Sequence, residues 1–220
     1  MRHPRADSAR PAGDSCWNHH RPGRRAVLFV GLAPLEESRI LVMMNIKIRQ
    51  MDAQSIHQVD TFELNSIVNS HLVLHVEENR ITYSIVPVAP YEKRLNIETD
   101  DYTSFIDNPQ KAIFFADVDS KLVGQIKMIP WWNKFAYVEE LVVNPDFRGK
   151  GIGKVLMDRA IAWAKGQNFP GIMLETQDNN VPACKLYEKC GFKLSGFDVN
   201  TFKNFPETKN EVALYWYLIF

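Results

Sequence analysis

The sequence predicts an α/β domain built on a mixed, mostly antiparallel sheet with helices on both faces. Stretches rich in β-branched and aromatic residues, which are typical of strands, alternate with segments of helical periodicity. A glycine-rich stretch, NPDFRGKGIGK, separates one such strand from the helical segment that follows it. With 220 residues, the chain is long enough for one domain with a sizeable core.

The elements before the glycine-rich stretch follow from local patterns. Residues 45–50, NIKIRQ, alternate apolar and polar side chains, as a strand does. The other elements predicted in this half are one or two helices within 53–76 with a break near Asn69 and Ser70, a strand at 80–88, a short helix at 100–108 capped by Asp100 or Asp101, and a hairpin of two strands within 112–129.

The second half carries clearer signals. From Ile152 onward, apolar residues recur on one face of a helix, with Lys154 and Asp158 off that face. The elements predicted here are a strand at 135–143, a helix at 151–166, a strand at 171–176, a helix at 180–190, and closing strands at 192–199 and 211–219.

Composition narrows the class of protein. The 26 Lys and Arg balance the 26 Asp and Glu, which argues against a nucleic-acid-binding protein. No apolar run reaches the ~20 residues of a membrane helix, so no membrane partner is expected. The 3 cysteines favour a reducing, cytoplasmic location over a disulfide framework. Neither the cysteines nor the pair His71 and His75 has the further ligands of a metal site, so no metal is predicted.

A boundary falls near residue 43. Residues 1–43 contain seven Arg and no Lys, whereas residues 44–220 contain five Arg and fourteen Lys. The apolar run AVLFVGLAPL follows a long polar lead, which disfavours a signal peptide. We expect residues 1–43 to be a disordered or non-native leader and residues 44–220 to form the domain.

The glycine-rich stretch has the features of an anion site. Gly149, Gly151 and Gly153 enter the predicted helix, and glycine permits positive φ and the close approach of another group. The first N–H groups of a helix have no internal partner and lie at the positive end of its dipole, where phosphate binds well. The basic residues that add charge here are Arg148, Lys150 and Lys154.

Two common phosphate-binding patterns do not fit this stretch. A P-loop requires Ser or Thr after its Gly-Lys pair, but Val155 follows Lys154. A G-x-G-x-x-G turn requires a third glycine where the sequence has Lys154 or Leu156. The pattern R-x-x-G-x-G that begins at Arg148 instead resembles the pyrophosphate loop of the GNAT superfamily of N-acetyltransferases.

A second motif supports the same resemblance. NNVPACKLYEKCGF, residues 179–192, is similar to a later motif of that superfamily, in which an Asn starts a helix that carries a Tyr and ends in Gly-Phe. Three longer stretches further resemble the streptothricin acetyltransferases, namely PWWNKFAYVEELVV, GIMLETQDNNVPACKLYEKCGF and YEKRLNIETDDYTSFIDNPQKAIFFA. The resemblance covers roughly residues 44–220 and implies an N-acetyltransferase domain there.

The resemblance implies acetyl-CoA as cosubstrate and strands that splay apart at the acetyl-CoA site. The backbone of residues 141–143 would hold the pantetheine arm, and one of its N–H groups would hold the oxyanion. The coenzyme-binding residues that it implies are Leu141, Val142, Val143, Arg148, Gly149, Lys150, Gly151, Ile152, Gly153, Lys154, Asn180 and Tyr187.

Amine acetylation requires a neutral amine. A lysine-type amine has a pKa of about 10.4, so only a few in ten thousand are neutral at pH 7. A carboxylate is therefore needed to bind the ammonium and take its proton, directly or through water. Glu139 and Glu140 are adjacent in a predicted strand and are expected on opposite faces. The resemblance favours Glu139 beside the amine; the alternative is that both are solvated strand acids.

Tyr187 is the residue that the resemblance places near the thioester sulfur. A Tyr of pKa about 10 is a weak acid toward a thiol of pKa about 8.5, so we expect it to stabilise the thiolate by a hydrogen bond. The alternative is a core Tyr that packs on Gly191 and Phe192. Asn180 is either a helix cap or, by the resemblance, a contact of the coenzyme arm.

The sequence gives few signals for the residues that recognise the substrate. Trp131 and Trp132 precede a strand and are predicted to form an aromatic wall for a cation. Asp100 and Asp101 would add negative charge. The alternative is that the two tryptophans anchor their loop by burial.

These features favour an enzyme that acetylates a small cationic amine. The resemblance points to the β-lysine moiety of the antibiotic streptothricin, with direct attack of the amine on the thioester and resistance as the result. An acetyltransferase of a protein N-terminus, a lysine, a polyamine or an aminoglycoside is the alternative enzyme. A coenzyme-A-binding module without turnover is the alternative from another class. A homodimer is compatible with the sequence.

Overall fold

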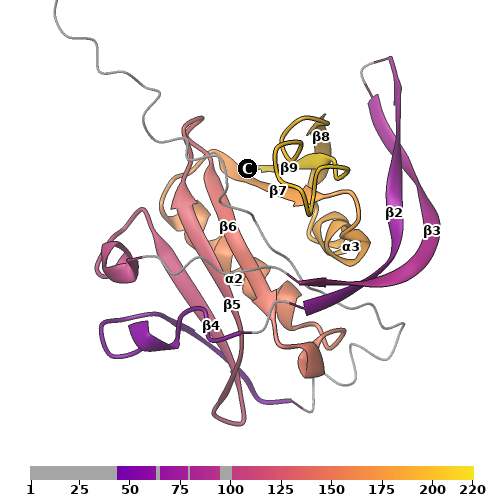
Figure 1. Ribbon diagram of the computed structural model, residues 1–220. Coiled ribbons are helices and arrows are strands. Elements are labelled where there is room, and N and C mark those ends of the chain that lie inside the picture. Colours follow the sequence, from indigo (N-terminus) through magenta and orange to yellow (C-terminus); the bar gives the residue numbers. More distant parts are fainter. Residues whose placement is uncertain (1–43, 63–64, 79, 95–100) are drawn as a thin grey trace, which may run out of the picture.

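A computed structural model describes residues 44–62, 65–78, 80–94 and 101–220. They form a seven-stranded sheet of strand order β1-β4-β5-β6-β7-β9-β8 and a separate two-stranded sheet, β2-β3 (Figure 1). Within the seven-stranded sheet, β6 and β7 are parallel and the other neighbouring pairs are antiparallel. The predicted mixed, mostly antiparallel sheet is confirmed. The predicted leader, residues 1–43, and Asp100 lie outside the described residues.

The elements have bounds close to those predicted for the second half of the chain. Every strand and helix expected after residue 112 is present within two residues of its expected limits. The elements are β1 (Ile46–Gln50), η1 (Ile56–Gln58), β2 (Asn65–Glu77), β3 (Arg80–Arg94), η2 (Tyr102–Phe105), β4 (Ala112–Val118), β5 (Lys121–Pro130), β6 (Ala136–Val143), η3 (Pro145–Phe147), α2 (Ile152–Gly166), β7 (Gly171–Gln177), α3 (Val181–Lys189), β8 (Lys193–Asp198) and β9 (Ala213–Ile219).

The prediction of helices within 53–76 is wrong, apart from the single 3-10 turn η1. The second half of this stretch belongs to β2, which pairs with β3 in a long hairpin that curves beside α3 (Figure 1). The run IVNSHLVLHV is rich in β-branched residues, and pairing with β3 decides an ambiguity that periodicity leaves open. The break expected near Asn69 is a β-bulge between Val68 and Ser70.

The short helix expected at 100–108 is the 3-10 turn η2. Asp101 caps this turn, because its side chain accepts a hydrogen bond from the Thr103 N–H at 2.9 Å. The turn buries Phe105 against the sheet. A cap was therefore predicted correctly at Asp101, although the helix is shorter than expected.

The parallel strands β6 and β7 part midway along their length. They are paired only from Ala136 to Val138 on β6 and from Ile172 to Leu174 on β7. On its other side, β6 stays paired with β5 as far as Val143. The backbone of β6 beyond Val138 therefore has an open edge toward β7, which is the splay that the resemblance implied.

Both α-helices cover one face of the sheet. Phe114 of β4 meets Trp163 of α2 at a ring distance of 6.5 Å. Trp216 of β9 lies 5.8 Å from the ring of Tyr187 of α3, and all four side chains belong to one buried cluster. The largest part of the core thus lies between the sheet and these two helices.

The opposite face is covered by 3-10 turns. Ile113 and Phe115 of β4 alternate with the residues that face α2, and they pack with Phe105 of η2 and with Val59. Helical segments therefore lie on both faces, as predicted, but the second face carries η1 and η2 in place of α-helices. Among the described residues, no helix is long and apolar enough to cross a membrane.

Candidate active site

The opening between β6 and β7 begins at a β-bulge. Val138 pairs with Met128 and Glu140 pairs with Lys127, so Glu139 is an additional residue on β6. A bulge interrupts side-chain alternation, and the simple alternation that predicted opposite faces for Glu139 and Glu140 does not hold here. Both glutamates are buried, with 9% and 7% of their surface exposed.

Glu140 is enclosed by a polar network on the face that carries η2. Its carboxylate accepts a hydrogen bond from Gln125 Nε2 at 2.5 Å, and its second oxygen lies 3.7 Å from Lys127 Nζ. Lys127 also pairs with Asp60 at 2.5 Å, and the Tyr102 hydroxyl donates to Asp60. Burial raises the pKa of Glu140 to about 6, and the charge of Lys127 opposes this rise. These partners give Glu140 a structural role that links η2 to the sheet.

Glu175 is a third carboxylate at the opening, and the sequence interpretation missed it. It is the first residue of β7 beyond the last pair with β6, just as Glu139 is the first on β6. Both acids interact electrostatically with Tyr137. Burial, with a contribution from Asp198, raises the pKa of Glu175 to about 7. Among the described residues it has no hydrogen bond or ion pair.

The signal for Glu175 was weak in the sequence. It stands in GIMLETQ at the end of an apolar strand, where an acid is unremarkable in itself. Its interest rests on the register of β7 against β6, which ends at Leu174 and Val138 and so puts Glu175 and Glu139 each one residue beyond the last pair. A β-strand pattern does not encode which strand it pairs with.

The glycine-rich stretch caps α2 near the open end of β6. Gly151 is the N-cap with φ of 81°, and Gly149 has φ of 71°. This left-handed backbone favours glycine strongly. The first N–H groups of α2 face out of the helix end, which is a geometry suited to an anion. Ile152 and Gly153 are buried in the first turn.

Arg148 stabilises this loop through hydrogen bonds to two backbone carbonyl groups. Its Nε donates to the carbonyl of Val143 at 3.0 Å, and its Nη1 donates to the carbonyl of Asn65 at 2.8 Å. Burial lowers the pKa of Arg148 to about 10, so the guanidinium is still charged at neutral pH. Arg148 therefore ties the end of β6 to the base of the β2-β3 hairpin while it keeps a positive charge beside the cap.

Lys150 and Lys154 lie at the exposed side of the same loop. Lys150 Nζ donates to the carbonyl of Asp146 at 2.8 Å. Lys154 pairs with Asp158 one turn later on α2, at 2.6 Å. Both side chains are long and surface-exposed enough to exchange these contacts for an anion at the cap.

Tyr187 is fully buried, and its ring lies 5.9 Å from that of Phe192, as a core tyrosine would. Its hydroxyl is close to that of Thr176, yet neither makes a hydrogen bond of normal geometry with a described residue. Burial raises the pKa of Tyr187 well above its usual value, so the hydroxyl remains a donor. Thr176 lies on the part of β7 beyond its last pair with β6. Two buried hydroxyls are thus left without partners beside the opening, which is rare in a closed core.

The opening is bordered by backbone on two sides. Leu141, Val142 and Val143 are paired with β5 on one edge and face β7 with the other. On the β7 side, α3 begins after Asn180, whose side chain makes no capping hydrogen bond to the described helix. Asn180 is nevertheless the N-cap residue of α3, as the helix-cap alternative expected, because its backbone carbonyl accepts from the Cys184 N–H.

The predicted aromatic wall is divided between a half-buried ring, Trp131, and an exposed ring, Trp132. Trp131 stacks on Tyr137 of β6 with ring centroids 4.1 Å apart and an interplanar angle of 18°. Trp132 is 70% exposed. Because Tyr137 interacts with Glu139 and Glu175, Trp131 lies close to the acids of the opening. Asp101 is instead engaged in capping η2.

The predicted helical histidines lie on a strand. His71 and His75 belong to β2, and His75 Nε2 is 3.1 Å from Ser84 Oγ of β3. In the described part of the chain, no group of three or more His, Cys, Asp or Glu is arranged to hold a metal ion.

Two parallel strands that part beside a glycine-capped helix define the fold of an acetyltransferase. The profile of the Acetyltransferase (GNAT) family matches residues 75–192, and the chain belongs to this family. It is an N-acetyltransferase.

Similar proteins narrow the class further. The chain is 41% identical to a streptothricin acetyltransferase of Escherichia coli over 156 residues, which is 70% of this chain and 86% of that protein. It is also 41% identical to streptothricin acetyltransferase A of Bacillus subtilis over 132 residues, 60% of this chain and 75% of that protein. A solved structure from Bacillus anthracis, assigned as a streptothricin acetyltransferase in complex with acetyl coenzyme A, superposes with a TM-score of 0.73 at 40% identity over 80% of this chain and 98% of that one.

Proposed function

We propose that this enzyme transfers the acetyl group of acetyl-CoA to an amine in the β-lysine moiety of streptothricin, and so confers resistance to that antibiotic. The observation that carries the proposal is the opening between β6 and β7, which has two carboxylates at its inner end and the glycine cap of α2 at its outer end. The relatives named streptothricin acetyltransferase support the choice of acceptor.

The coenzyme fits the polar groups that border the opening. Its pyrophosphate is an anion suited to the cap of α2, with Arg148 beside it. Its pantetheine arm carries amides that pair with the open backbone edge of residues 141–143. The unpartnered hydroxyls of Tyr187 and Thr176 offer hydrogen bonds to the thioester end.

The acidic end of the opening suits an ammonium group. Glu139 binds the protonated amine, accepts its proton directly or through water, and relays that proton to Glu175. Glu175 is suited to receive it because its pKa of about 7 lies near the operating pH. Trp131 and Tyr137 present aromatic faces to the same cation.

The neutral amine then attacks the thioester carbonyl directly. The new C–N bond forms as the carbonyl oxygen gains negative charge, and a backbone N–H of residues 141–143 stabilises this oxyanion. The C–S bond breaks next, and the Tyr187 hydroxyl donates a hydrogen bond to the departing thiolate. The remaining N–H proton passes to the thiolate or to solvent, which leaves a neutral amide.

Thiol release from acetyl-CoA tests this proposal. Purified enzyme is assayed with streptothricin, a histone peptide, spermidine and an aminoglycoside, each at a range of concentrations. The highest kcat/KM is expected with streptothricin. A preference for the peptide, the polyamine or the aminoglycoside would favour the alternative acceptor instead, and turnover with none of them would favour a coenzyme-binding module.

We propose further that the enzyme acts in the cytoplasm, where its thiols stay reduced, and that it forms a homodimer. The β2-β3 hairpin supports the second point, because it exposes a set of apolar side chains, namely Ile67, Val73, Val76, Ile85 and Val86. Light scattering coupled to size exclusion distinguishes a dimer of 25.3 kDa chains from a monomer.

A further inference from the structure

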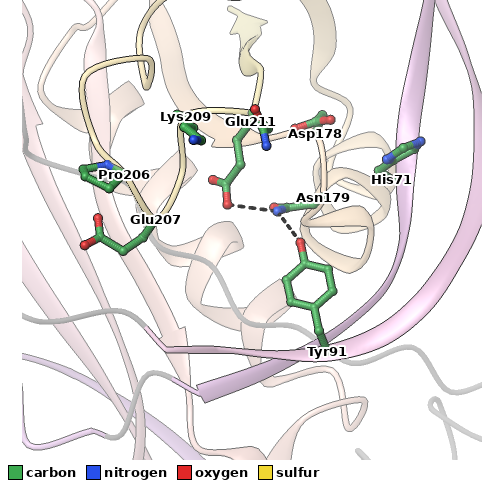
Figure 2. Close-up of a pocket in the computed structure, with 9 residues that line it drawn as sticks. His71, Tyr91, Asp178, Asn179, Pro206, Glu207, Lys209 and Glu211 are labelled. Carbon is green, nitrogen blue, oxygen red and sulfur yellow. Dashed lines mark hydrogen bonds between the residues drawn. The ribbon is translucent and has the colours of Figure 1, made fainter.

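A pocket of about 320 Å³ lies at the carboxyl end of β7. Its walls come from the β2-β3 hairpin, from the connection between β7 and α3, and from the loop that precedes β9 (Figure 2). The residues of this β7-end pocket that matter here are Tyr91, Asp178, Asn179, Glu207, Lys209 and Glu211. None of them belongs to the site that the sequence predicted.

The β7-end pocket is continuous in sequence with the opening. β7 leaves β6 after Leu174, passes Glu175 and ends at Gln177, and Asp178 is the next residue. Three residues of extended chain span about 10 Å, which is the distance along β7 from Glu175 to Asp178. The hairpin also connects the two places, since Asn65 contacts Arg148 and the same hairpin carries Tyr91.

Polar side chains that contact one another form the interior of the β7-end pocket. Asn179 donates to the Tyr91 hydroxyl at 3.1 Å and to Glu211 at 3.0 Å, while Lys93 pairs with Glu211 at 2.6 Å. Glu211 is 9% exposed, and its second carboxylate oxygen has no hydrogen-bond partner among the described residues. Figure 2 shows its carboxylate directed toward Asn179, inside the pocket. A buried anionic oxygen without a donor is costly, and a ligand N–H would satisfy it.

The charge of the lining favours a cation. Asp178 uses one oxygen to accept from the Val212 N–H at 2.9 Å, and burial raises its pKa, although the charge of His71 in the same lining opposes this rise. Glu207 is exposed at the rim. Lys209 is the lysine of the lining, and Tyr91, 46% exposed, offers an aromatic face. The anionic phosphates of the coenzyme are unsuited to this lining.

We infer that the β7-end pocket binds a second cationic group of the acceptor, an ammonium or guanidinium about 10 Å from the reacting amine. The inference rests on the proposed function in that the acceptor is cationic. It adds a substrate class: amines with at least two separated positive charges, which bridge the acids of the opening and those of the pocket. Monoamines lack the second contact and bind weakly.

Four substitutions test the inference. Asp178→Asn removes the charge but keeps an oxygen for the Val212 N–H, and Glu207→Gln removes a charge at the exposed rim. Lys209→Gln removes the opposing positive charge. Glu77→Gln removes an acid at the far end of β2 and is the matched control. Each variant is assayed for KM with streptothricin and with acetyl-CoA, and for calorimetric binding of spermidine.

The substitutions are expected to change the KM for streptothricin in opposite directions, according to the charge that each one removes. Asp178→Asn should raise the KM for streptothricin about tenfold, because a partly buried charge opposite a ligand cation contributes more than an exposed one. Glu207→Gln should raise it about threefold, Lys209→Gln should lower it by a similar factor, and Glu77→Gln should leave it unchanged. The KM for acetyl-CoA should not change in any variant, which also reports that each one is folded.

Three outcomes would overturn the inference. The KM for streptothricin would be the same in all variants, or the KM for acetyl-CoA would rise in its place, or Glu77→Gln would act like Asp178→Asn. If the unmodified enzyme does not acetylate streptothricin, the proposed acceptor fails, and spermidine binding then decides the pocket separately. If Asp178→Asn does not fold, Glu207→Gln and Lys209→Gln still test the inference, because they should change the KM for streptothricin in opposite directions.

Discussion

Glu140 is buried and Glu175 is half-buried, both in inner strands of one sheet, and burial raises the pKa of each, to about 6 and about 7. Their surroundings differ. Glu140 has Gln125 and Lys127 within reach and lies where β6 is held by β5. Glu175 has no such partner among the described residues and lies where β7 has left β6. A buried acid enclosed by side-chain partners joins parts of the fold, whereas a half-buried acid beside an opening is available to a substrate.

The largest expected effect separates Glu139 from Glu140. Glu139→Gln should lower kcat/KM by about 10²- to 10⁴-fold, the usual span for loss of a general base, and should leave the affinity for acetyl-CoA unchanged. The rate of this variant should continue to rise toward high pH, because only amine that is already neutral reacts. Steady-state kinetics between pH 6 and pH 10 measure both effects.

Glu140→Gln is the control for that prediction. Its kcat/KM should stay within a few-fold of the unmodified enzyme, since Glu140 faces Lys127 and Gln125. If Glu140→Gln damages activity and Glu139→Gln does not, the assignment of the two acids must be exchanged. If neither changes the pH profile, the amine loses its proton to another group.

The second-largest expected effect is a change in the pH dependence of activity when Glu175 is replaced. The unmodified enzyme should gain activity as pH rises through about 7, because Glu175 must be ionised to accept a proton and its pKa is raised to that value. Glu175→Gln should lose this step and about 10²-fold in kcat/KM at pH 7. A variant that kept the same step near pH 7 would show that Glu175 is not the group that titrates.

A smaller effect concerns the other end of the opening. Gly151→Asp should weaken acetyl-CoA binding at least tenfold, because it places an anion at the cap and a side chain at φ of 81°. Gly151→Ala carries the same backbone strain without the charge and should bind more tightly than the Asp variant. Calorimetry measures both affinities. Near-normal binding by folded Gly151→Asp would contradict the assignment of the loop.

The stability of Glu140→Gln gives a smaller and different signal. Since the folded-state pKa of Glu140 is raised from 4.5 to about 6, its protonated form stabilises the fold below pH 4.5, and this contribution is lost as pH rises through 6. The unmodified protein should therefore lose about 2 kcal/mol relative to Glu140→Gln over that window. Urea unfolding at pH 4.5 and pH 7 measures the change. An identical pH dependence in both proteins would show that Glu140 keeps an ordinary pKa.

The smallest effect is expected at the N-terminus. We propose that residues 44–220 suffice for the domain, so a chain that begins at Met44 should keep the kcat/KM and the Tm of the full chain. Enzyme assays and thermal unfolding compare the two. A large loss of either would show that residues 1–43 contribute to the fold or the site.

The accuracy of the sequence interpretation differed between the two halves of the chain. After residue 112, strands and helices lie where their patterns predicted, because each has a strong period and a glycine or an N-cap at its end. Residues 53–76 were predicted as helical, and their second half belongs to β2. An apolar, β-branched run of this length suits either period, and its pairing partner, β3, lies outside the run itself.

The candidate site divides in the same way. The cap of α2 follows from glycines that need positive φ, and the position of Tyr187 follows from helical spacing, so both were local predictions. The bulge at Glu139 was not predictable, because it depends on register between β5 and β6. The pH-dependent kinetics of Glu139→Gln and Glu175→Gln will show how Glu139 and Glu175 share the transfer of the proton.

The sequence by itself determined the order of most elements, the glycine cap before α2 and the resemblance to N-acetyltransferases, because these depend on residues that are neighbours along the chain. Only the tertiary structure decided that Glu140 is enclosed by Lys127 and Gln125, that Glu175 and Glu139 each follow the last pair of β7 and β6, and that a pocket forms between β3 and the loop before β9. These features depend on strand register and on contacts between distant segments, which packing of the whole core selects and no local pattern specifies.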